Sequence, residues 1–194
     1  MKLYYAPGAC SLADHIALHA AGFTFEHEKV DLKAKRTESG EDFATINPKG
    51  YVPALVLDSG DTLTENVAIL DWIAHEAEGL KPSGPMGHTR LLMTLAFIST
   101  EIHKSFKPFF AGAGEEEKKK AEEMILKRLG YLSGTMGGEF LFGPEVSVAD
   151  FYLFVMLLWA RKHGVEVSQQ FVDYRERMMA LPPVRKAMQH EGLV

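Results

Sequence analysis

The chain has 194 residues and a formal net charge of −5, with 46% hydrophobic and 24% charged residues. This composition is typical of a globular protein with room for one large domain or two small ones. The negative charge argues against nonspecific nucleic-acid binding, which depends on neutralising phosphates. No apolar run reaches the roughly 18–20 residues that a membrane span needs. We therefore expect neither a nucleic-acid nor a membrane partner.

Cysteine usage and the first residues predict the compartment. Cys10 is the single cysteine, which excludes an internal disulfide and fits a reducing environment. Met1 and Lys2 lead straight into a strand-like run, so we expect no signal peptide. The expected localisation is cytoplasmic.

The first elements place this cysteine at a defined position. Residues 3–5 are apolar and aromatic and predict a strand, residues 6–8 have turn chemistry, and residues 12–21 have a helical apolar pattern that Gly22 ends. Cys10 would then lie at or just before a helix start, where free N–H groups and the helix dipole favour a thiolate. Cys10 is therefore a candidate reactive sulfur, with a buried small hydrophobe as the alternative.

The next residues extend this start into a small domain. The predicted elements are a strand at 23–32, a short helical turn at 42–44, a strand at 52–58, a hairpin turn at 58–61, a returning strand at 62–64 and a helix at 66–75. The first strand, helix and second strand form a parallel crossover, and the rest forms a hairpin covered by a helix. This order is that of a thioredoxin-like domain.

Residues 76–88 are rich in Gly and Pro and predict a linker, after which no convincing strand pattern follows. The expected helices span residues 89–110, 115–132, 148–160, 171–180 and 184–191. The predicted fold class is therefore α/β plus all-α. A thioredoxin-like domain at 1–77 is followed by a linker at 78–88 and an all-helical domain at 89–194.

Two local patterns support the helical domain. The run 115–120 has i,i+4 spacing that would pair Glu115 with Lys119 and Glu116 with Lys120 on a solvated face. Ser147 and Asp150 form a capping-box pattern. The helix that begins there is apolar on nearly every face, so we expect it to be the buried centre of this domain.

These motifs, in this order, resemble the glutathione transferases, and most closely the bacterial beta class. The motifs are Lys2-Leu3-Tyr4-Tyr5 to Cys10-Ser11, Asn47-Pro48-Lys49-Gly50-x-Val52-Pro53, Leu63-Thr64-Glu65-x-Val67-Ala68-Ile69, Glu101-x-His103-Lys104 and the capping box. The resemblance covers essentially the full length. It implies a homodimer, a glutathione site in the thioredoxin-like domain and a hydrophobic pocket between the domains.

The resemblance assigns glutathione contacts in the first domain. Val52 and Pro53 match a cis-proline corner whose backbone pairs with the cysteinyl part of glutathione, although a proline that simply begins a strand is common. Glu65 would accept from the γ-glutamyl ammonium, and Asn66 would cap a helix start that binds the carboxylate. Lys35 is a candidate for the glycyl carboxylate, and a solvated lysine is the alternative.

The resemblance also points His103 and Lys104 towards the glutathione sulfur, as donors that favour its thiolate. Ala96 stands where family members have an asparagine, so one polar contact to glutathione is missing. Aromatic residues could line an electrophile pocket, although helical spacing is more typical of core; these are Phe106, Phe109, Phe110 and Trp159. His15 is interpreted as a packing residue.

Together these residues predict a glutathione transferase that directs the glutathione thiolate at a small hydrophobic electrophile. Glutathione is the co-substrate, and no further cofactor is expected. Cys10 could also form a mixed disulfide with glutathione, which would give thiol-disulfide exchange or peroxidase activity. A non-catalytic binding or regulatory protein with the same fold is the alternative.

Overall fold

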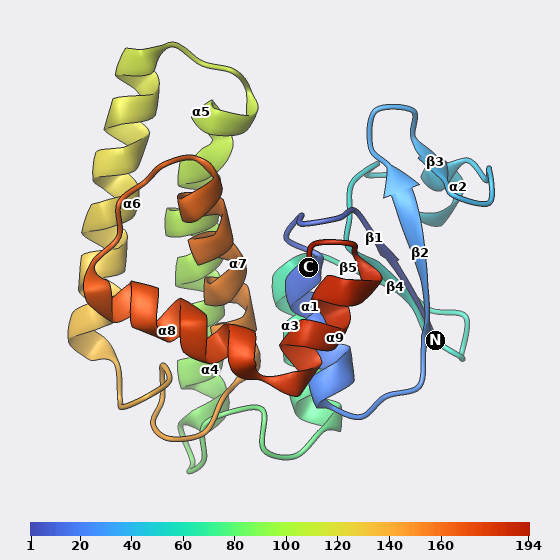
Figure 1. Cartoon of the computed structure of the whole chain (residues 1–194). Coiled ribbons are helices and arrows are strands. Elements are labelled where there is room, and N and C mark those ends of the chain that lie inside the picture. Colours follow the sequence, from blue (N-terminus) through green and yellow to red (C-terminus); the bar gives the residue numbers. More distant parts are fainter. The chain divides into compact units, whose positions relative to one another are not determined.

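A computed structural model describes residues 1–194, which form two compact units (Figure 1). One unit contains Met1–Glu78 together with Ala180–Val194, and the other contains Gly79–Met179. The sequence placed residues 89–194 in one helical domain. The structure differs, because the last residues fold back onto the first unit.

The first unit contains a five-stranded sheet in the order β3-β2-β1-β4-β5. Its strands are β1 (Lys2–Tyr5), β2 (Glu26–Asp31), β3 (Arg36–Thr37), β4 (Ala54–Val56) and β5 (Thr62–Thr64). β1 and β2 are parallel and β4 and β5 antiparallel, which confirms the predicted crossover and hairpin. The sequence missed β3, since two residues carry no alternation. β2 begins at Glu26 rather than at Phe23, because the residues before it pair with no neighbouring strand.

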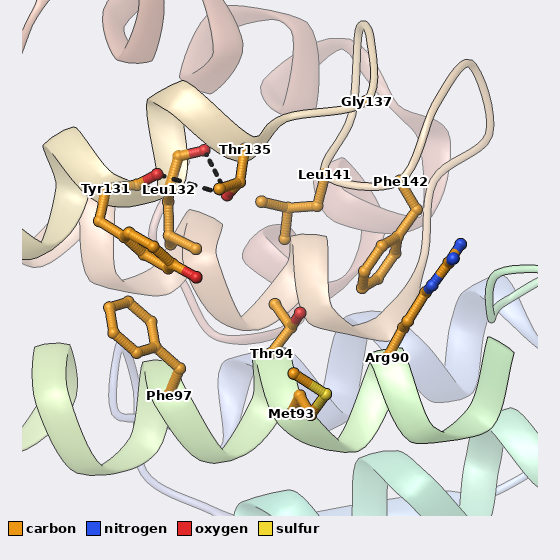
Figure 2. Close-up of a pocket in the computed structure, with 10 residues that line it drawn as sticks. All are labelled: Arg90, Met93, Thr94, Phe97, Tyr131, Leu132, Thr135, Gly137, Leu141 and Phe142. Atoms are coloured by element: carbon orange, nitrogen blue, oxygen red, sulfur yellow. Dashed lines mark hydrogen bonds between the residues drawn. The ribbon is translucent and has the colours of Figure 1, made fainter. Parts of the chain in front are cut away.

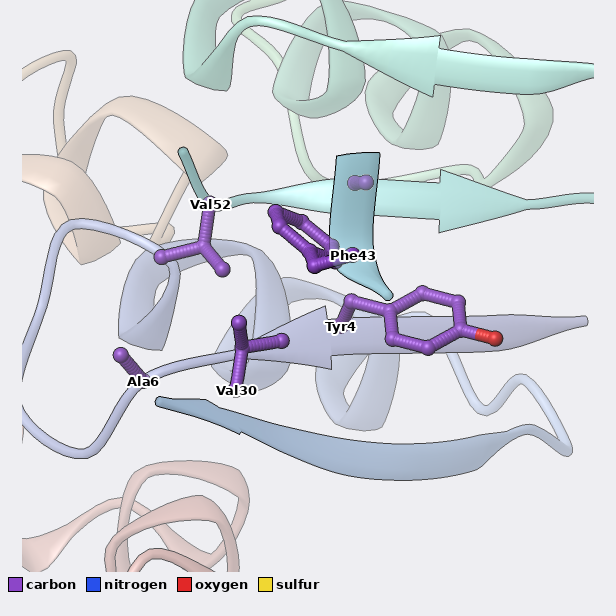
Figure 3. Close-up of a cluster of buried hydrophobic side chains, with 6 residues drawn as sticks. Tyr4, Ala6, Val30, Phe43 and Val52 are labelled. Atoms are coloured by element: carbon purple, nitrogen blue, oxygen red, sulfur yellow. The ribbon is translucent and has the colours of Figure 1, made fainter. Parts of the chain in front are cut away.

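One face of this sheet packs against the short helix α2 (Phe43–Ile46). The buried cluster on this face includes Tyr4 from β1, Val30 from β2, Phe43 from α2 and Val52 (Figure 3). The Tyr4 and Phe43 rings lie 5.9 Å apart. Full burial of a side chain as large as that of Phe43 contributes about 1.5–3 kcal/mol, so this cluster fixes the segment that leads to Pro53.

Three further helices belong to the same unit: α1 (Leu12–Ala20), α3 (Asn66–Glu76) and α9 (Pro182–His190). α1 packs against both α3 and α9 (Figure 1). Just after α9, the Glu191 carboxylate accepts the backbone N–H of Gly8 at 2.8 Å. The end of α9 therefore holds the turn that precedes Cys10.

The second unit is helical, as predicted. It contains α4 (Gly87–Phe97), a π-helical turn η1 (Ile98–Ile102), a 3-10 turn η2 (His103–Phe106), α5 (Lys107–Phe110), α6 (Glu115–Thr135), α7 (Val148–Lys162) and α8 (Gln169–Ala180). The predicted helix at 89–110 is one helical run whose regularity breaks just before His103, and such π-turns are frequent at functional sites. No helix in either unit has the length and apolar character that a membrane span requires.

α7 is the buried centre of this unit, as expected, and its start is a capping box. The Asp150 carboxylate accepts the backbone N–H groups of Ser147 and Leu141, each at 2.8 Å, and the Tyr174 hydroxyl at 2.7 Å. These bonds join the preceding loop, α7 and α8 at one carboxylate.

The charged first turns of α6 contain two ion pairs, of which one is the predicted pair and the other has a different lysine partner. Glu116 binds Lys120 at 2.7 Å, as the spacing predicts. Glu115 binds Lys118 at 2.8 Å rather than Lys119, because on a helix the i,i+3 neighbour lies as close as the i,i+4 neighbour.

Candidate functional site

Cys10 lies in the turn before α1, two residues ahead of the first helical residue. The fully buried Ser11 hydroxyl accepts the backbone N–H of Ala6 at 3.3 Å and so closes this turn. The Cys10 Sγ then lies 3.7 Å from the backbone carbonyl oxygen of Val52, to which the thiol donates. The predicted placement of the cysteine at a helix start is confirmed.

The expectation that this placement favours a thiolate is wrong for the ligand-free protein. Burial raises the pKa of Cys10 to about 12, and the Asp14 carboxyl, one helical turn further on, acts in the same direction. The helix start offers N–H groups, but low-dielectric surroundings penalise the thiolate more strongly. Cys10 is therefore a neutral thiol at physiological pH.

The corner opposite Cys10 is formed by Val52 and Pro53, whose peptide bond is cis, as the resemblance implies. The loop before it is tied together by Asn47, which donates through Nδ2 to the Tyr51 carbonyl at 2.6 Å and accepts the Lys49 N–H at 3.1 Å. These bonds hold the corner in place.

Glu65 occupies the N-cap position of α3 and has a φ of 72°. This φ is unfavourable for a non-glycine residue, and such strain gathers at functional sites. Its Oε1 atom accepts Lys49 Nζ at 2.5 Å and the Tyr51 hydroxyl at 2.6 Å. Bonds from Lys49 and then Tyr51 lower the pKa of Glu65, so it presents an exposed carboxylate.

Asn66 does not cap α3, contrary to the sequence prediction, because the helix begins at Asn66 itself. Its buried amide nitrogen donates to Asp14 Oδ2 at 2.6 Å and to the Cys10 carbonyl at 3.0 Å, in the amide orientation that these two acceptors assign. Asn66 therefore joins the start of α3 to the Cys10 turn.

Lys35 is exposed, and its Nζ donates to the carbonyl of Gly50, just before the Val52 corner. The structure thus brings together Cys10, Val52, Pro53, Glu65 and Asn66, and Lys35 contacts the loop before Val52 through Gly50. His103 and Lys104 belong to the other unit.

His103 begins η2, and its Nδ1 lies 2.6 Å from the hydroxyl of the buried Tyr152. The Trp159 ring meets the imidazole edge-on at 4.9 Å. Burial, and then the charge of Lys104, lower the pKa of His103 to about 4, so the ring is neutral at physiological pH. Lys104 is exposed and lines a shallow pocket with Lys107 and Lys120.

The aromatic residues near His103 are mainly core. Phe106 and Trp159 are buried and meet edge-on at 5.6 Å, whereas Phe110 is exposed and packs on Trp159 at 4.7 Å. Ala96 is exposed on α4.

A separate pocket of about 450 Å³ lies between α4, α6 and the loop after α6 (Figure 2). Phe97 and Tyr131 form one wall, with ring centroids 5.1 Å apart, and Met93 is exposed at its floor. It contains none of the residues that the sequence singled out.

Four supporting residues were missed at the sequence level: Asp14, Lys49, Tyr51 and Tyr152. Asp14 follows Cys10 by four residues, so helical spacing could have identified it. Lys49 and Tyr51 lie within a quoted motif, but spacing gives no side-chain direction. Tyr152 lies far from His103 in sequence, and nothing local indicates the contact.

The fold and site define the class of protein: a thioredoxin-like domain that holds a single cysteine against a cis-proline corner, joined to a helical domain. The chain matches the family model described as "Glutathione S-transferase, N-terminal domain" over residues 1–75. It matches "Glutathione S-transferase, C-terminal domain" over residues 90–182. The chain belongs to the glutathione S-transferase family.

Similar proteins agree with this assignment. Glutathione S-transferase GstA of Escherichia coli O157:H7 is 40% identical over 200 aligned residues, covering 100% of both chains. A beta class glutathione S-transferase structure from Sphingomonas chungbukensis has 45% identity and a TM-score of 0.92, also covering 100% of both chains. A sphingomonad glutathione S-transferase structure complexed with glutathione has 45% identity and a TM-score of 0.93 over 100% of both chains.

Proposed function

We propose that this protein is a cytoplasmic glutathione transferase that joins the glutathione sulfur to small hydrophobic electrophiles. In this reaction the glutathione thiol loses its proton, its sulfur forms a bond to an electrophilic carbon, and the leaving group departs with the bonding electron pair. The observation that carries the proposal is the meeting of three segments: Cys10 Sγ faces the Val52 carbonyl, and Asn66 joins the Cys10 turn to the start of α3.

This arrangement offers complementary groups for each part of glutathione. The backbone of Val52 can pair with the cysteinyl unit. Both protein contacts of Glu65 use Oε1, which leaves Oε2 to accept from the γ-glutamyl ammonium. The free N–H groups at the start of α3 suit the γ-glutamyl carboxylate. Lys35, beside Gly50, suits the glycyl carboxylate.

Cys10 acts in this proposal as a hydrogen-bond donor to the glutathione thiolate. Its raised pKa of about 12 keeps the proton on Sγ, and a protonated thiol stabilises a neighbouring anion without attacking it. Mixed-disulfide chemistry needs the Cys10 thiolate instead. The site therefore supports conjugation more strongly than disulfide exchange or peroxidase activity.

His103 is proposed as a second donor. If the Tyr152 hydroxyl donates to Nδ1, the neutral imidazole carries its proton on Nε2, where it can meet an anionic sulfur. Tyr152 is then a positioning residue that selects the tautomer.

We also propose a homodimer, supported by the family assignment and by the exposed Met93 and Tyr131 side chains at the pocket shown in Figure 2.

The test measures glutathione binding by calorimetry and conjugation of a chloronitroaromatic electrophile. We expect Glu65→Gln to weaken glutathione binding at least about tenfold, because it removes the charge that pairs with the ammonium. Glu115→Gln, at another exposed ion-paired glutamate, is the matched control and should change nothing. No conjugation together with no glutathione binding would refute the proposal, and binding without turnover would favour a non-catalytic protein.

Two substitutions separate the roles of Cys10. Cys10→Ser keeps an O–H donor and should retain conjugation better than Cys10→Ala. An intact-mass spectrum recorded after exposure to oxidised glutathione should show little adduct at neutral pH. Rapid formation of one adduct on Cys10 would favour thiol-disulfide exchange.

A further inference from the structure

Four of the eight histidines gather at one place in the thioredoxin-like unit. His15 and His19 lie one turn apart on α1, His27 lies on β2, and His190 ends α9. Every ring lies within 5.5 Å, centroid to centroid, of at least one other. None of them belongs to the glutathione site proposed above.

The ring nitrogens in this cluster have the spacing of metal ligands. His190 Nδ1 lies 3.4 Å from His15 Nε2 and 3.3 Å from His19 Nε2. One nitrogen each from His15, His27 and His190 lies within 4.8 Å of the other two. Two imidazole nitrogens that share a tetrahedral Zn²⁺ at about 2.1 Å are roughly 3.4 Å apart. The His15–His190 and His19–His190 separations therefore match those of two ligands on one ion, and a His27 nitrogen lies within 4.8 Å of the His15 and His190 nitrogens.

Hydrogen bonds among the rings do not satisfy this arrangement. A neutral imidazole has one N–H and one lone pair, so His190 Nδ1 has at most one hydrogen to share between two facing nitrogens. A cation placed among these lone pairs would satisfy them together.

The second ring nitrogen of His15, Nδ1, contacts a carboxylate, as the second nitrogen of a metal-binding histidine usually does. His15 Nδ1 lies 3.0 Å from Glu191 Oε1, and both side chains are fully buried. Ligating histidines usually hold their second nitrogen to a carboxylate, which fixes the tautomer and the ring orientation. If Nδ1 carries the proton and donates it to Glu191, the Nε2 lone pair of His15 faces His190. Glu191 is itself held by the Gly8 N–H.

The cluster is open on its outer side. His27 and His190 are exposed and His15 is buried, so an ion can enter from solvent and meet a fixed ligand. Phe25 and Tyr5 wall the inner side, with ring centroids 4.8 Å from His19 and 5.4 Å from His15, respectively. The exposed His27 and His190 rings stack at 4.7 Å on this open side.

We propose that His15, His27 and His190 bind one divalent transition-metal ion, with His19 offering a fourth nitrogen. Imidazole ligands suit Zn²⁺, Cu²⁺ and Ni²⁺, and the tetrahedral spacing favours Zn²⁺. The ion would join α1, β2 and α9, and so fasten the end of the chain to the thioredoxin-like unit.

The test uses untagged protein in a Cys10→Ser background, so that the thiol contributes no metal binding. Zn²⁺ is titrated by calorimetry and Co²⁺ by visible absorption, which reports tetrahedral coordination. We expect one ion per chain and a higher melting temperature with Zn²⁺. His27→Gln and His190→Gln should each weaken binding at least about tenfold, because each removes a ligand.

His75→Gln, at an exposed histidine on α3, is the matched control and should bind Zn²⁺ like the parent protein. The two tested histidines are also exposed, so their substitution spares the core, and circular dichroism confirms the fold. Undetectable Zn²⁺ binding would overturn the proposal. So would unchanged affinity in both His27→Gln and His190→Gln, since the ion would then lie elsewhere.

Discussion

The two units each bury one aspartate completely, and the two aspartates have opposite surroundings. Burial raises the pKa of both carboxyl groups. Asp150, in the helical unit, accepts from Leu141, Ser147 and Tyr174 through both of its oxygens. Asp14, in the thioredoxin-like unit, accepts from Asn66 through Oδ2, and its Oδ1 has no hydrogen-bond partner.

This difference separates a buried carboxylate that is fully hydrogen-bonded from one that is only partly so. Leaving a buried polar atom unpaired costs about 1–3 kcal/mol, so a purely structural aspartate would be expected to resemble Asp150. Asp14 lies beside Cys10 and raises the pKa of its thiol. Local rules are broken most often at functional positions, which fits this location.

The largest effect is expected from substitution of Asp150, whose two carboxylate oxygens both accept hydrogen bonds. Asp150→Ala removes the shared acceptor of the loop, α7 and α8, and leaves several buried donors unpaired. We expect the free energy of unfolding, measured with urea, to fall by about 3–5 kcal/mol. Tyr174→Phe removes a single donor and should cost only about 1 kcal/mol. Equal losses in the two variants would contradict the central role of the carboxylate.

The second prediction concerns the reactivity that burial imposes on Cys10. With a pKa of about 12, the thiolate fraction at pH 8 is about a thousandfold smaller than that of an ordinary cysteine, whose pKa is about 8.5. Alkylation by iodoacetamide should therefore be slow and rise about tenfold per pH unit up to pH 10. A plateau near pH 7–8 would show instead that the helix start stabilises the thiolate.

The smallest expected effect tests the unsatisfied aspartate. The folded-state pKa of Asp14 is raised above its unfolded value, so its contribution to stability is full below about pH 3.9 and is lost as pH rises towards the folded pKa. Relative to Asp14→Asn, the unmodified protein should lose stability in urea unfolding as the pH rises above about 4. The variant should also alkylate a few-fold faster at Cys10. If the two proteins had identical profiles of stability against pH, Asp14 would not have the raised pKa that this prediction requires.

Local patterns predicted much of the fold and the position of the site. The strand-turn-helix at Cys10, the hairpin at residues 52–64 and the capping box at Asp150 each depend on neighbours close in sequence. The sequence missed what distant neighbours decide. Asn66 reaches across to Asp14, burial from several segments raises the pKa of Cys10, and α9 joins α1 rather than the helical unit.

The return of α9 has a consequence for how the protein is made. During synthesis the first 78 residues leave the ribosome well before residues 180–194, with the whole helical unit in between. Until α9 arrives, Gly8 and His15 have no Glu191 to bind, and one side of α1 has no partner. The thioredoxin-like unit is therefore completed only after the helical unit has been synthesised, although its own chain begins first.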